Sequence, residues 1–196
     1  CKYLERKIGV SYDPKKETLV TVGGSEAIDI GLRCMLDPGD EVLLPQPSYV
    51  SYLPCTVMAD GVPVIIPLKS ENEFKLTVEE LEEHTTPKTK VLIMPFPNNP
   101  TGSIMTKEDL EPIAEFVKEH DLYVLSDEIY SELTYGTEHV SIASLPGMRE
   151  RTIVINGFSK GFAMTGWRLG YCCGPENIIE QMIKLHQFAI MCAPTT

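Results

Sequence analysis

The sequence predicts an α/β domain built on a mostly parallel sheet flanked by helices. Short apolar runs alternate along the chain with segments of helical periodicity, which is the order of elements typical of a parallel sheet. The 196 residues fit one domain, and the 43% of hydrophobic residues are enough to form its core. No internal repeat or low-complexity tract divides the chain, so we expect a single domain over residues 1–196.

The strands are expected at seven short apolar runs. These runs are residues 19–22, 41–44, 62–67, 90–94, 123–126, 152–156 and 169–173. Helices are expected at 25–36, 77–84 and 176–189. A further helix should begin at Thr106, because Thr106 and Asp109 form a capping-box pattern and apolar residues follow at helical spacing.

Composition and charge exclude several classes of function. The chain has 17 Lys and Arg against 28 Asp and Glu, a net charge of −11, so a nucleic acid is a poor partner. No apolar run approaches the ~20 residues of a membrane helix, and no membrane partner is expected. The six cysteines are dispersed without C-x-x-C spacing, which favours reduced thiols in a cytoplasmic protein and no metal site.

The ends of the chain predict a fragment of a longer protein. The sequence has no initiator Met and begins at residues 1–8 with what reads as the tail of a helix. It stops after Ala193-Pro194-Thr195-Thr196 without a terminal tail.

The segments that follow strands are the candidates for chemistry, because ligands of open α/β sheets bind beyond the carboxyl ends of the strands. In Gly23-Gly24-Ser25, a strand passes directly into a helix, whose free amides favour an anion such as phosphate. A glycine turn without a ligand is an equally good interpretation of this segment alone. Tyr49 follows the second strand and can stack on a planar ligand, although a packed surface tyrosine is the simpler alternative.

Two further loops carry polar groups. Asn99 lies in an Asn-Pro-Thr-Gly turn, where its amide can point into the crevice as donor and acceptor; a plain turn is the alternative. Asp127 comes at the end of a buried strand, and a carboxylate there requires a positive partner or several donors. Glu128 is interpreted as a solvated or structural carboxylate.

The segment from Gly157 to Tyr171 contains Lys160 and Arg168 among apolar and small residues. Desolvation there would lower the pKa of Lys160 and leave a nucleophilic amine. Arg168 would need an anion, and a phosphate would accept its two parallel N–H groups. A surface lysine and a structural ion-pair arginine are the simpler alternatives.

Together these segments require one ligand with a phosphate, a planar ring, a cationic ring nitrogen and a carbonyl carbon. Pyridoxal 5′-phosphate has all four, and proteins hold it through a lysine Schiff base and an acidic partner for the ring nitrogen. The joint pattern is far more specific than any of its members.

The motifs, in this order, resemble the large domain of class I/II aminotransferases of the aspartate and aromatic aminotransferase type, which has the fold-type I pyridoxal phosphate architecture. The resemblance implies that Lys160 forms the Schiff base and then shuttles the substrate proton, while Asp127 keeps the ring nitrogen protonated. By the same resemblance, Asn99 and Tyr130 hydrogen-bond the phenolic oxygen and Tyr49 stacks on the ring. The phosphate would be held by Gly24, Ser25 and Arg168, with Ser159 beside the lysine also in the cofactor site.

Two departures accompany the resemblance. Many family members have Ser or Thr three residues before the lysine, where this chain has Gly157. The family also uses an N-terminal arm, a partner subunit and a downstream small domain whose arginine binds the substrate carboxylate. This chain contains neither the arm nor the small domain, so we expect these 196 residues alone to be inactive. The resemblance implies that the enzyme is a homodimer.

The predicted function is an aminotransferase that moves an amino group between an L-amino acid and a 2-oxo acid. Two alternatives remain open at this stage: a pyridoxal phosphate-dependent carbon–sulfur lyase of the same fold, and a domain that binds the cofactor without turnover.

Overall fold

A seven-stranded mixed sheet forms the centre of the computed structural model, which describes residues 1–194. Its strand order is β1-β7-β6-β5-β4-β2-β3, with β5 in the middle. Four neighbouring pairs are parallel, and the two pairs that involve β7 are antiparallel. The strands are β1 (Thr18–Thr21), β2 (Glu41–Gln46), β3 (Val62–Pro67), β4 (Thr89–Met94), β5 (Tyr123–Asp127), β6 (Thr152–Gly157) and β7 (Gly170–Cys173).

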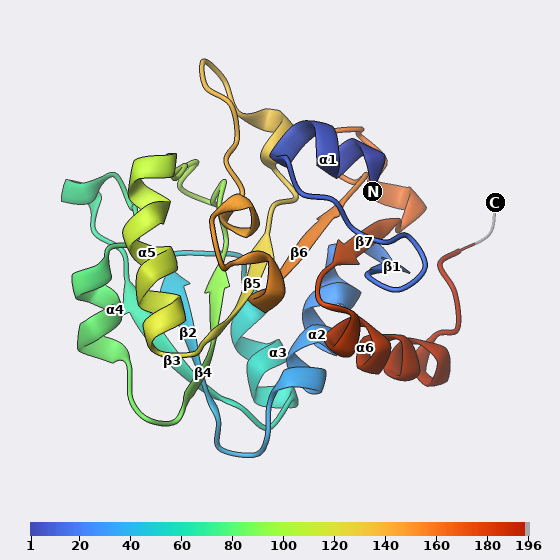
Figure 1. The fold of residues 1–196 in the computed structure, drawn as a ribbon, viewed down its shortest axis with the longest axis horizontal. Coiled ribbons are helices and arrows are strands. Elements are labelled where there is room, and N and C mark those ends of the chain that lie inside the picture. The colour runs from blue at the N-terminus through green and yellow to red at the C-terminus, as the bar shows by residue number, and fades with distance from the viewer. Residues whose placement is uncertain (195–196) are drawn as a thin grey trace.

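Helices cover both faces of this sheet (Figure 1). One face packs against α2, α3 and α6, and the other against α4 and α5. The short helix α1 lies over β6 and β7 with Leu4 buried beneath it. The helices are α1 (Lys2–Ile8), α2 (Gly23–Met35), α3 (Tyr52–Met58), α4 (Val78–His84), α5 (Lys107–Glu119) and α6 (Glu176–Ala189).

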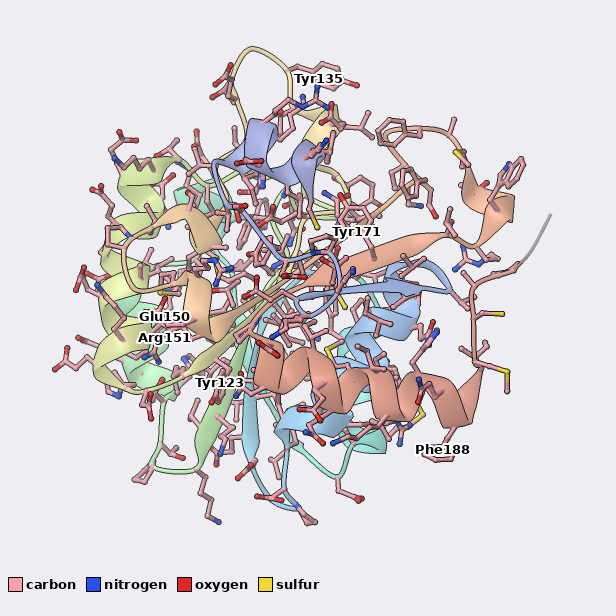
Figure 2. The ribbon with its side chains drawn as sticks, turned by 45° about the vertical axis from the view of Figure 1, so that its right-hand side comes forward. Tyr123, Tyr135, Glu150, Arg151, Tyr171 and Phe188 are labelled. Atoms are coloured by element: carbon pink, nitrogen blue, oxygen red, sulfur yellow. The ribbon has the colours of Figure 1, made fainter. Side chains whose placement is uncertain are left out.

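Exposed aromatic residues lie at the margins of these layers. Figure 2 shows Tyr135 at the tip of the loop that follows β5 and Phe188 near the end of α6. Their exposed fractions are 87% and 92%, whereas the central strands β5 and β6 are almost fully buried. No helix within residues 1–194 has the length and apolar character that crossing a membrane requires.

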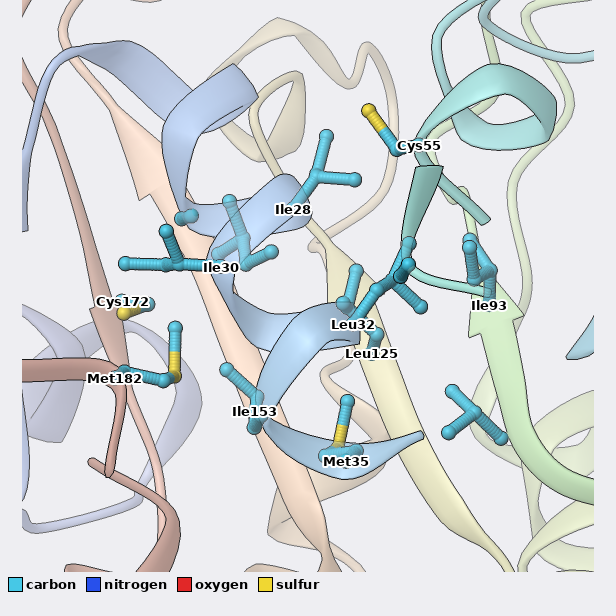
Figure 3. Packing of buried hydrophobic residues seen from close by; sticks show 14 of the residues in the cluster. Ile28, Ile30, Leu32, Met35, Cys55, Ile93, Leu125, Ile153, Cys172 and Met182 are labelled. Atoms are coloured by element: carbon cyan, nitrogen blue, oxygen red, sulfur yellow. The ribbon is translucent and has the colours of Figure 1, made fainter. Parts of the chain in front are cut away.

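The alternation of side chains along the central strands explains why both faces are covered. In β4, Ile93 packs toward α2 and α3 while Leu92 packs toward α4 and α5. Leu125 and Val124 of β5 divide in the same way. Figure 3 shows the first of these two clusters, in which side chains of α2 meet those of β5 and β6. Continuous apolar strands of this kind are typical of parallel sheets buried on both sides.

The predicted elements are present with small shifts at their ends. All seven expected strands form, and the helices at 25–36, 77–84 and 176–189 correspond to α2, α4 and α6. The capping box at Thr106 and Asp109 is confirmed: each residue's side chain accepts a hydrogen bond from the other's backbone amide. Helix α3 was not predicted, because it has seven residues and Pro54 in its first turn.

The topology brings the functional segments to one end of the sheet. The parallel strands β2, β4, β5 and β6 finish at this end. Strand β7 begins there because it is antiparallel to β6, and β1 finishes there because it is antiparallel to β7. Loops distant in sequence therefore meet at a single edge.

Candidate functional site

One cavity of about 210 Å³ at this end of the sheet contains every residue that the sequence analysis selected. Its lining also includes Tyr52 and Thr165, which were not selected. The selected residues in the lining are Gly24, Ser25, Tyr49, Asn99, Asp127, Tyr130, Ser159, Lys160 and Arg168.

Several cavities of larger volume lie elsewhere, among them two of about 340 and 350 Å³. Both are lined by Thr134, Thr137, Glu138 and His139, and neither contains a selected residue. Volume alone therefore does not identify the candidate site. The smaller cavity is the one in which a buried carboxylate, a lysine and an arginine converge.

Asp127 is the most buried charged group of the cavity, with 6% of its surface exposed. Its Oδ2 accepts a hydrogen bond of 2.8 Å from the hydroxyl of Tyr52, and its Oδ1 accepts one of 3.2 Å from the amide of Ile129. Burial raises the pKa of Asp127 to about 6, although these two hydrogen bonds oppose the shift. The carboxylate thus lies in an environment that favours a cationic partner.

Tyr52 is a cavity residue that the sequence analysis missed. It is 4% exposed, and burial together with Asp127 raises the pKa of its phenol well above the usual value, so the hydroxyl remains a donor. The ring of Tyr49 meets it edge to face, with centroids 5.7 Å apart. Tyr49 precedes α3, and a turn in which the amide of Tyr52 donates to the carbonyl of Tyr49 at 3.3 Å joins the two residues.

Glu128 is buried rather than solvated, and its hydrogen bonds connect β5 to the loop that follows it. Its Oε1 accepts hydrogen bonds from the hydroxyls of Ser126 and Ser141, and its Oε2 lies 2.9 Å from Nε2 of His139. Of the two interpretations from the sequence, a structural carboxylate is therefore correct and a solvated carboxylate is wrong. Glu128 is thus held by three partners and is absent from the cavity lining, whereas Asp127 belongs to it.

Lys160 lies on an exposed segment, which corrects the expectation of a desolvated amine. The apolar neighbours that suggested burial, Phe162 and Trp167, are themselves 49% exposed, because the segment after β6 runs over the surface. The Nζ of Lys160 is 5.7 Å from the centre of the Tyr130 ring. The structure thus brings the lysine and this tyrosine together at the cavity.

Arg168 lies against the glycine turn at the start of α2. A Cβ on Gly23 would be 2.6 Å from Nη2 of Arg168, and Gly23 has φ +72°. The Nη1 group donates to the carbonyl of Thr165 at 3.0 Å, and no acidic side chain of residues 1–194 forms an ion pair with this arginine. The guanidinium therefore lies next to the start of α2, and the two together could bind one anion.

Gly157 has a steric explanation. A Cβ at this position would lie 3.0 Å from Cα of Gly170 and 3.0 Å from the carbonyl oxygen of Leu169. Both atoms belong to the backbone of the neighbouring chain segment, so Ser or Thr would force β6 and β7 apart. Ser159, two residues later, supplies a hydroxyl to the cavity lining instead.

The donor set of the cavity fits pyridoxal phosphate. A buried carboxylate without a cation suits a protonated ring nitrogen, and Arg168 with the start of α2 suits a phosphate. Tyr49 offers an exposed aromatic ring and Lys160 an accessible amine in the same cavity. Within residues 1–194, no three His, Cys, Asp or Glu side chains gather as a metal site would require.

Comparison with known proteins gives the family. The model of the family described as "Aminotransferase class I and II" matches residues 1–196. The chain belongs to this family. Members of the family use pyridoxal phosphate, in agreement with the donor set of the cavity.

Individual relatives of the chain are aminotransferases. The chain is 51% identical over 188 residues to aromatic-amino-acid aminotransferase 2 of Thermococcus litoralis, covering 95% of this chain and 48% of the relative. It is 51% identical over 193 residues to an aspartate aminotransferase of Pyrococcus abyssi, covering 98% and 50%. The crystal structure of an aromatic aminotransferase from Pyrococcus horikoshii superposes with a TM-score of 0.96 at 50% identity, covering 98% and 52%. The chain thus spans about half the length of the curated relatives it matches.

The raised pKa of Asp127 predicts a pH-dependent stability for the protein without cofactor. Because the folded pKa is about 6 and the ordinary value is 3.8, folding favours the protonated carboxyl. This contribution is fully present below about pH 4 and is lost as the pH rises through 6. At pH 8 the free energy of unfolding of Asp127→Asn, measured by urea denaturation, should therefore exceed that of the wild type by up to about 3 kcal/mol. The advantage should vanish at pH 4; an equal gain at both values would contradict the assigned cause.

Proposed function

We propose that this chain is the cofactor-binding large domain of a pyridoxal phosphate-dependent aminotransferase, which transfers an amino group between an L-amino acid and a 2-oxo acid. One observation carries the proposal: Asp127 at the end of β5, and Lys160 and Arg168 in the segment between β6 and β7, line one cavity at the carboxyl ends of the strands. The names of the relatives support transfer of an amino group over carbon–sulfur elimination.

Asp127 would hold the proton on the ring nitrogen of the cofactor. Its buried carboxylate gains a counter-charge in this way, and Tyr52 keeps the carboxyl group oriented through the hydrogen bond to Oδ2. When bound, the cofactor supplies an electron sink for the charge that develops at the substrate Cα.

Lys160 would bind the cofactor covalently through Nζ and, once released, accept and return the proton at the substrate Cα. Its position on an exposed segment gives the amine access to a ligand in the cavity. Tyr130 lies beside it and, with Asn99, would hydrogen-bond the phenolic oxygen of the cofactor.

The other end of the cavity would bind the phosphate. Gly24 and Ser25 contribute the first turn of α2, while Arg168 contributes a guanidinium that has no acidic partner in the described chain. Ser159 adds a hydroxyl, and Tyr49 would stack on the ring between these polar groups.

The activity is tested with the full-length protein by offering aromatic and dicarboxylic L-amino acids together with 2-oxoglutarate. We expect glutamate to form, and Lys160→Ala to lower kcat by at least about a thousandfold, because covalent attachment and proton transfer are both lost. Lys184→Ala, which removes an exposed lysine on α6, is the matched control and should retain full activity.

Cystathionine is also offered as a substrate, and two results would then contradict the proposal. Release of pyruvate from cystathionine without amino transfer would indicate a lyase. A visible absorbance band that an added amino acid leaves unchanged would indicate a domain that binds the cofactor without turnover. Borohydride reduction followed by peptide mapping gives the attachment site, and a label on a lysine other than Lys160 would overturn that assignment.

We also propose that the protein is a cytoplasmic homodimer. Val50, Leu53, Val57 and Met58 are apolar residues with exposed fractions of 40–81%, and they follow directly on Tyr49 of the cavity. Exposed apolar residues this close together in the chain are typical of an interaction site, and a second copy related by two-fold symmetry would cover them.

Light scattering at micromolar concentration tests the oligomeric state of the full-length protein. We expect a dimer for the wild type and a shift toward monomer for Val50→Glu, because the introduced charge would be buried in the interface. Tyr135→Ser, an equally exposed position in the loop after β5, should leave the dimer intact. A monomeric wild type would overturn the proposal.

A further inference from the structure

The exposed segment that carries Lys160 packs against Glu132. A Cβ on Gly161, the residue after Lys160, would lie 2.8 Å from Cβ and 3.2 Å from Cγ of Glu132. Glycine therefore lets the backbone beside Lys160 approach this side chain closely. Residues 160–163 are all exposed, so burial in the core does not fix their position. The contact with Glu132 supplies a support that the core does not.

Glu132 is in turn held by α1, which lies beside the turn that follows β5 (Figure 1). Its Oε1 accepts a hydrogen bond from the hydroxyl of Tyr3 and lies 3.0 Å from Nζ of Lys7. The same ammonium group donates to Oε2 at 3.2 Å. The hydrogen bonds from Tyr3 and Lys7 lower the pKa of the Glu132 carboxyl, so the group is ionised at neutral pH. Both carboxylate oxygens are thus attached to a helix 125 and 129 positions away in the sequence.

Tyr3 also reaches the lysine segment directly. Its ring meets that of Phe162 edge to face, with centroids 6.4 Å apart. The carbonyl of Lys160 accepts a hydrogen bond of 3.0 Å from the amide of Ala163, which closes a turn. Helix α1 therefore supports this turn at two adjacent residues, one through Glu132 and one through Tyr3.

Glu132 also belongs to the turn that follows Tyr130, the residue beside the Lys160 amine. The amide of Leu133 donates to the carbonyl of Tyr130 at 2.8 Å, in the short 3₁₀ turn Ser131–Leu133. The Nζ of Lys160 lies 5.7 Å from the centre of the Tyr130 ring. Glu132 therefore lies where the backbone of the tyrosine and the backbone of the lysine meet, and its side chain limits how closely they approach.

We propose that Glu132 is a positioning residue for Lys160: anchored on α1 by Tyr3 and Lys7, it supports Gly161 and so sets where the lysine amine lies in the cavity. The inference rests on the proposed function, since it assumes that Lys160 reacts with the carbonyl carbon of pyridoxal phosphate. It assigns a role in that reaction to α1, a helix that contributes no residue to the cavity lining.

The alternative is an ion pair that only decorates the surface. The side chains of Lys7 and Glu132 are 53% and 29% exposed, and exposed ion pairs contribute little to stability. Removing Glu132 should therefore leave the melting temperature nearly unchanged under both interpretations. The two interpretations differ in what happens to the reactivity of Lys160.

The test uses two probes on the full-length protein freed of cofactor. Pyridoxal phosphate attaches to Lys160, since Nζ adds to the aldehyde and water leaves; visible absorbance and borohydride trapping follow this step. The second probe, 4′-deoxypyridoxine 5′-phosphate, has a methyl group in place of the aldehyde and binds without a covalent bond. We expect Glu132→Ala to slow attachment by about tenfold, because displacing a reacting group by about 1 Å can cost up to about 100-fold. The dissociation constant of the second probe should change by less than about twofold, because Glu132 does not line the cavity.

Two further variants test the contact itself. Glu132→Gln keeps Cβ and Cγ against Gly161 and still accepts a hydrogen bond from Tyr3, so its attachment rate should lie within about threefold of the wild type. Gly161→Ala places a methyl group against Glu132 and should slow attachment by at least about tenfold. If one of Glu132→Ala and Gly161→Ala fails to fold, the other carries the test.

Glu138→Ala is the matched control. Glu138 is an exposed carboxylate of the loop after β5 and lines the cavity of about 350 Å³ together with Glu132. Its removal should leave the attachment rate and the affinity for the second probe unchanged. An equal slowing in Glu138→Ala and Glu132→Ala would assign the effect to the overall charge of the loop and overturn the inference.

Three other outcomes would overturn it. Glu132→Ala could attach pyridoxal phosphate at the rate of the wild type, it could lose affinity for the second probe as much as it loses attachment rate, or Glu132→Gln could be as slow as Glu132→Ala. Failure of the wild type to attach pyridoxal phosphate at Lys160 would instead overturn the proposed function, so the two failures are distinguishable.

Discussion

The carboxylate of Asp127, buried at the end of the central strand β5, is the constraint on which the rest of the site depends. Two hydrogen bonds, from Tyr52 and from the amide of Ile129, satisfy part of its requirement, and burial still raises its pKa to about 6. A negative charge held this deep is stabilised best by a cation that arrives with the ligand. The ring nitrogen of pyridoxal phosphate would meet that requirement, and its position would then determine where the carbonyl carbon and the phosphate lie.

The sheet explains how the remaining groups reach the same place. Helices occupy both faces, so the edge formed by the carboxyl ends of the parallel strands is where loops can meet. The antiparallel strand β7 brings Arg168 back to this edge, and β1 delivers the glycine turn opposite it. The contact between Glu26 and His186 connects the start of α2 to α6, a helix that does not line the cavity.

Local signals in the sequence were sufficient for the strands and the capping box at Thr106, and together with the family resemblance they selected nine of the residues that line the cavity. The sequence did not predict features that depend on contacts between distant segments. The hydrogen bond of Tyr52 to Asp127 spans 75 residues, and α3 is too short to show helical periodicity. The exposure of Lys160 was predicted wrongly, since apolar neighbours in sequence indicate burial only when another element covers them, and the segment after β6 lies at the surface.

The most direct test of the role of Asp127 compares pyridoxal phosphate with its analogue in which a carbon atom replaces the ring nitrogen. Dissociation constants of both ligands are measured for the full-length wild type and for Asp127→Ala. If the buried carboxylate binds a protonated ring nitrogen, the wild type should prefer pyridoxal phosphate by on the order of 100-fold, and the variant should lose this preference. Equal affinities in the wild type, or a preference that survives in Asp127→Ala, would contradict the account.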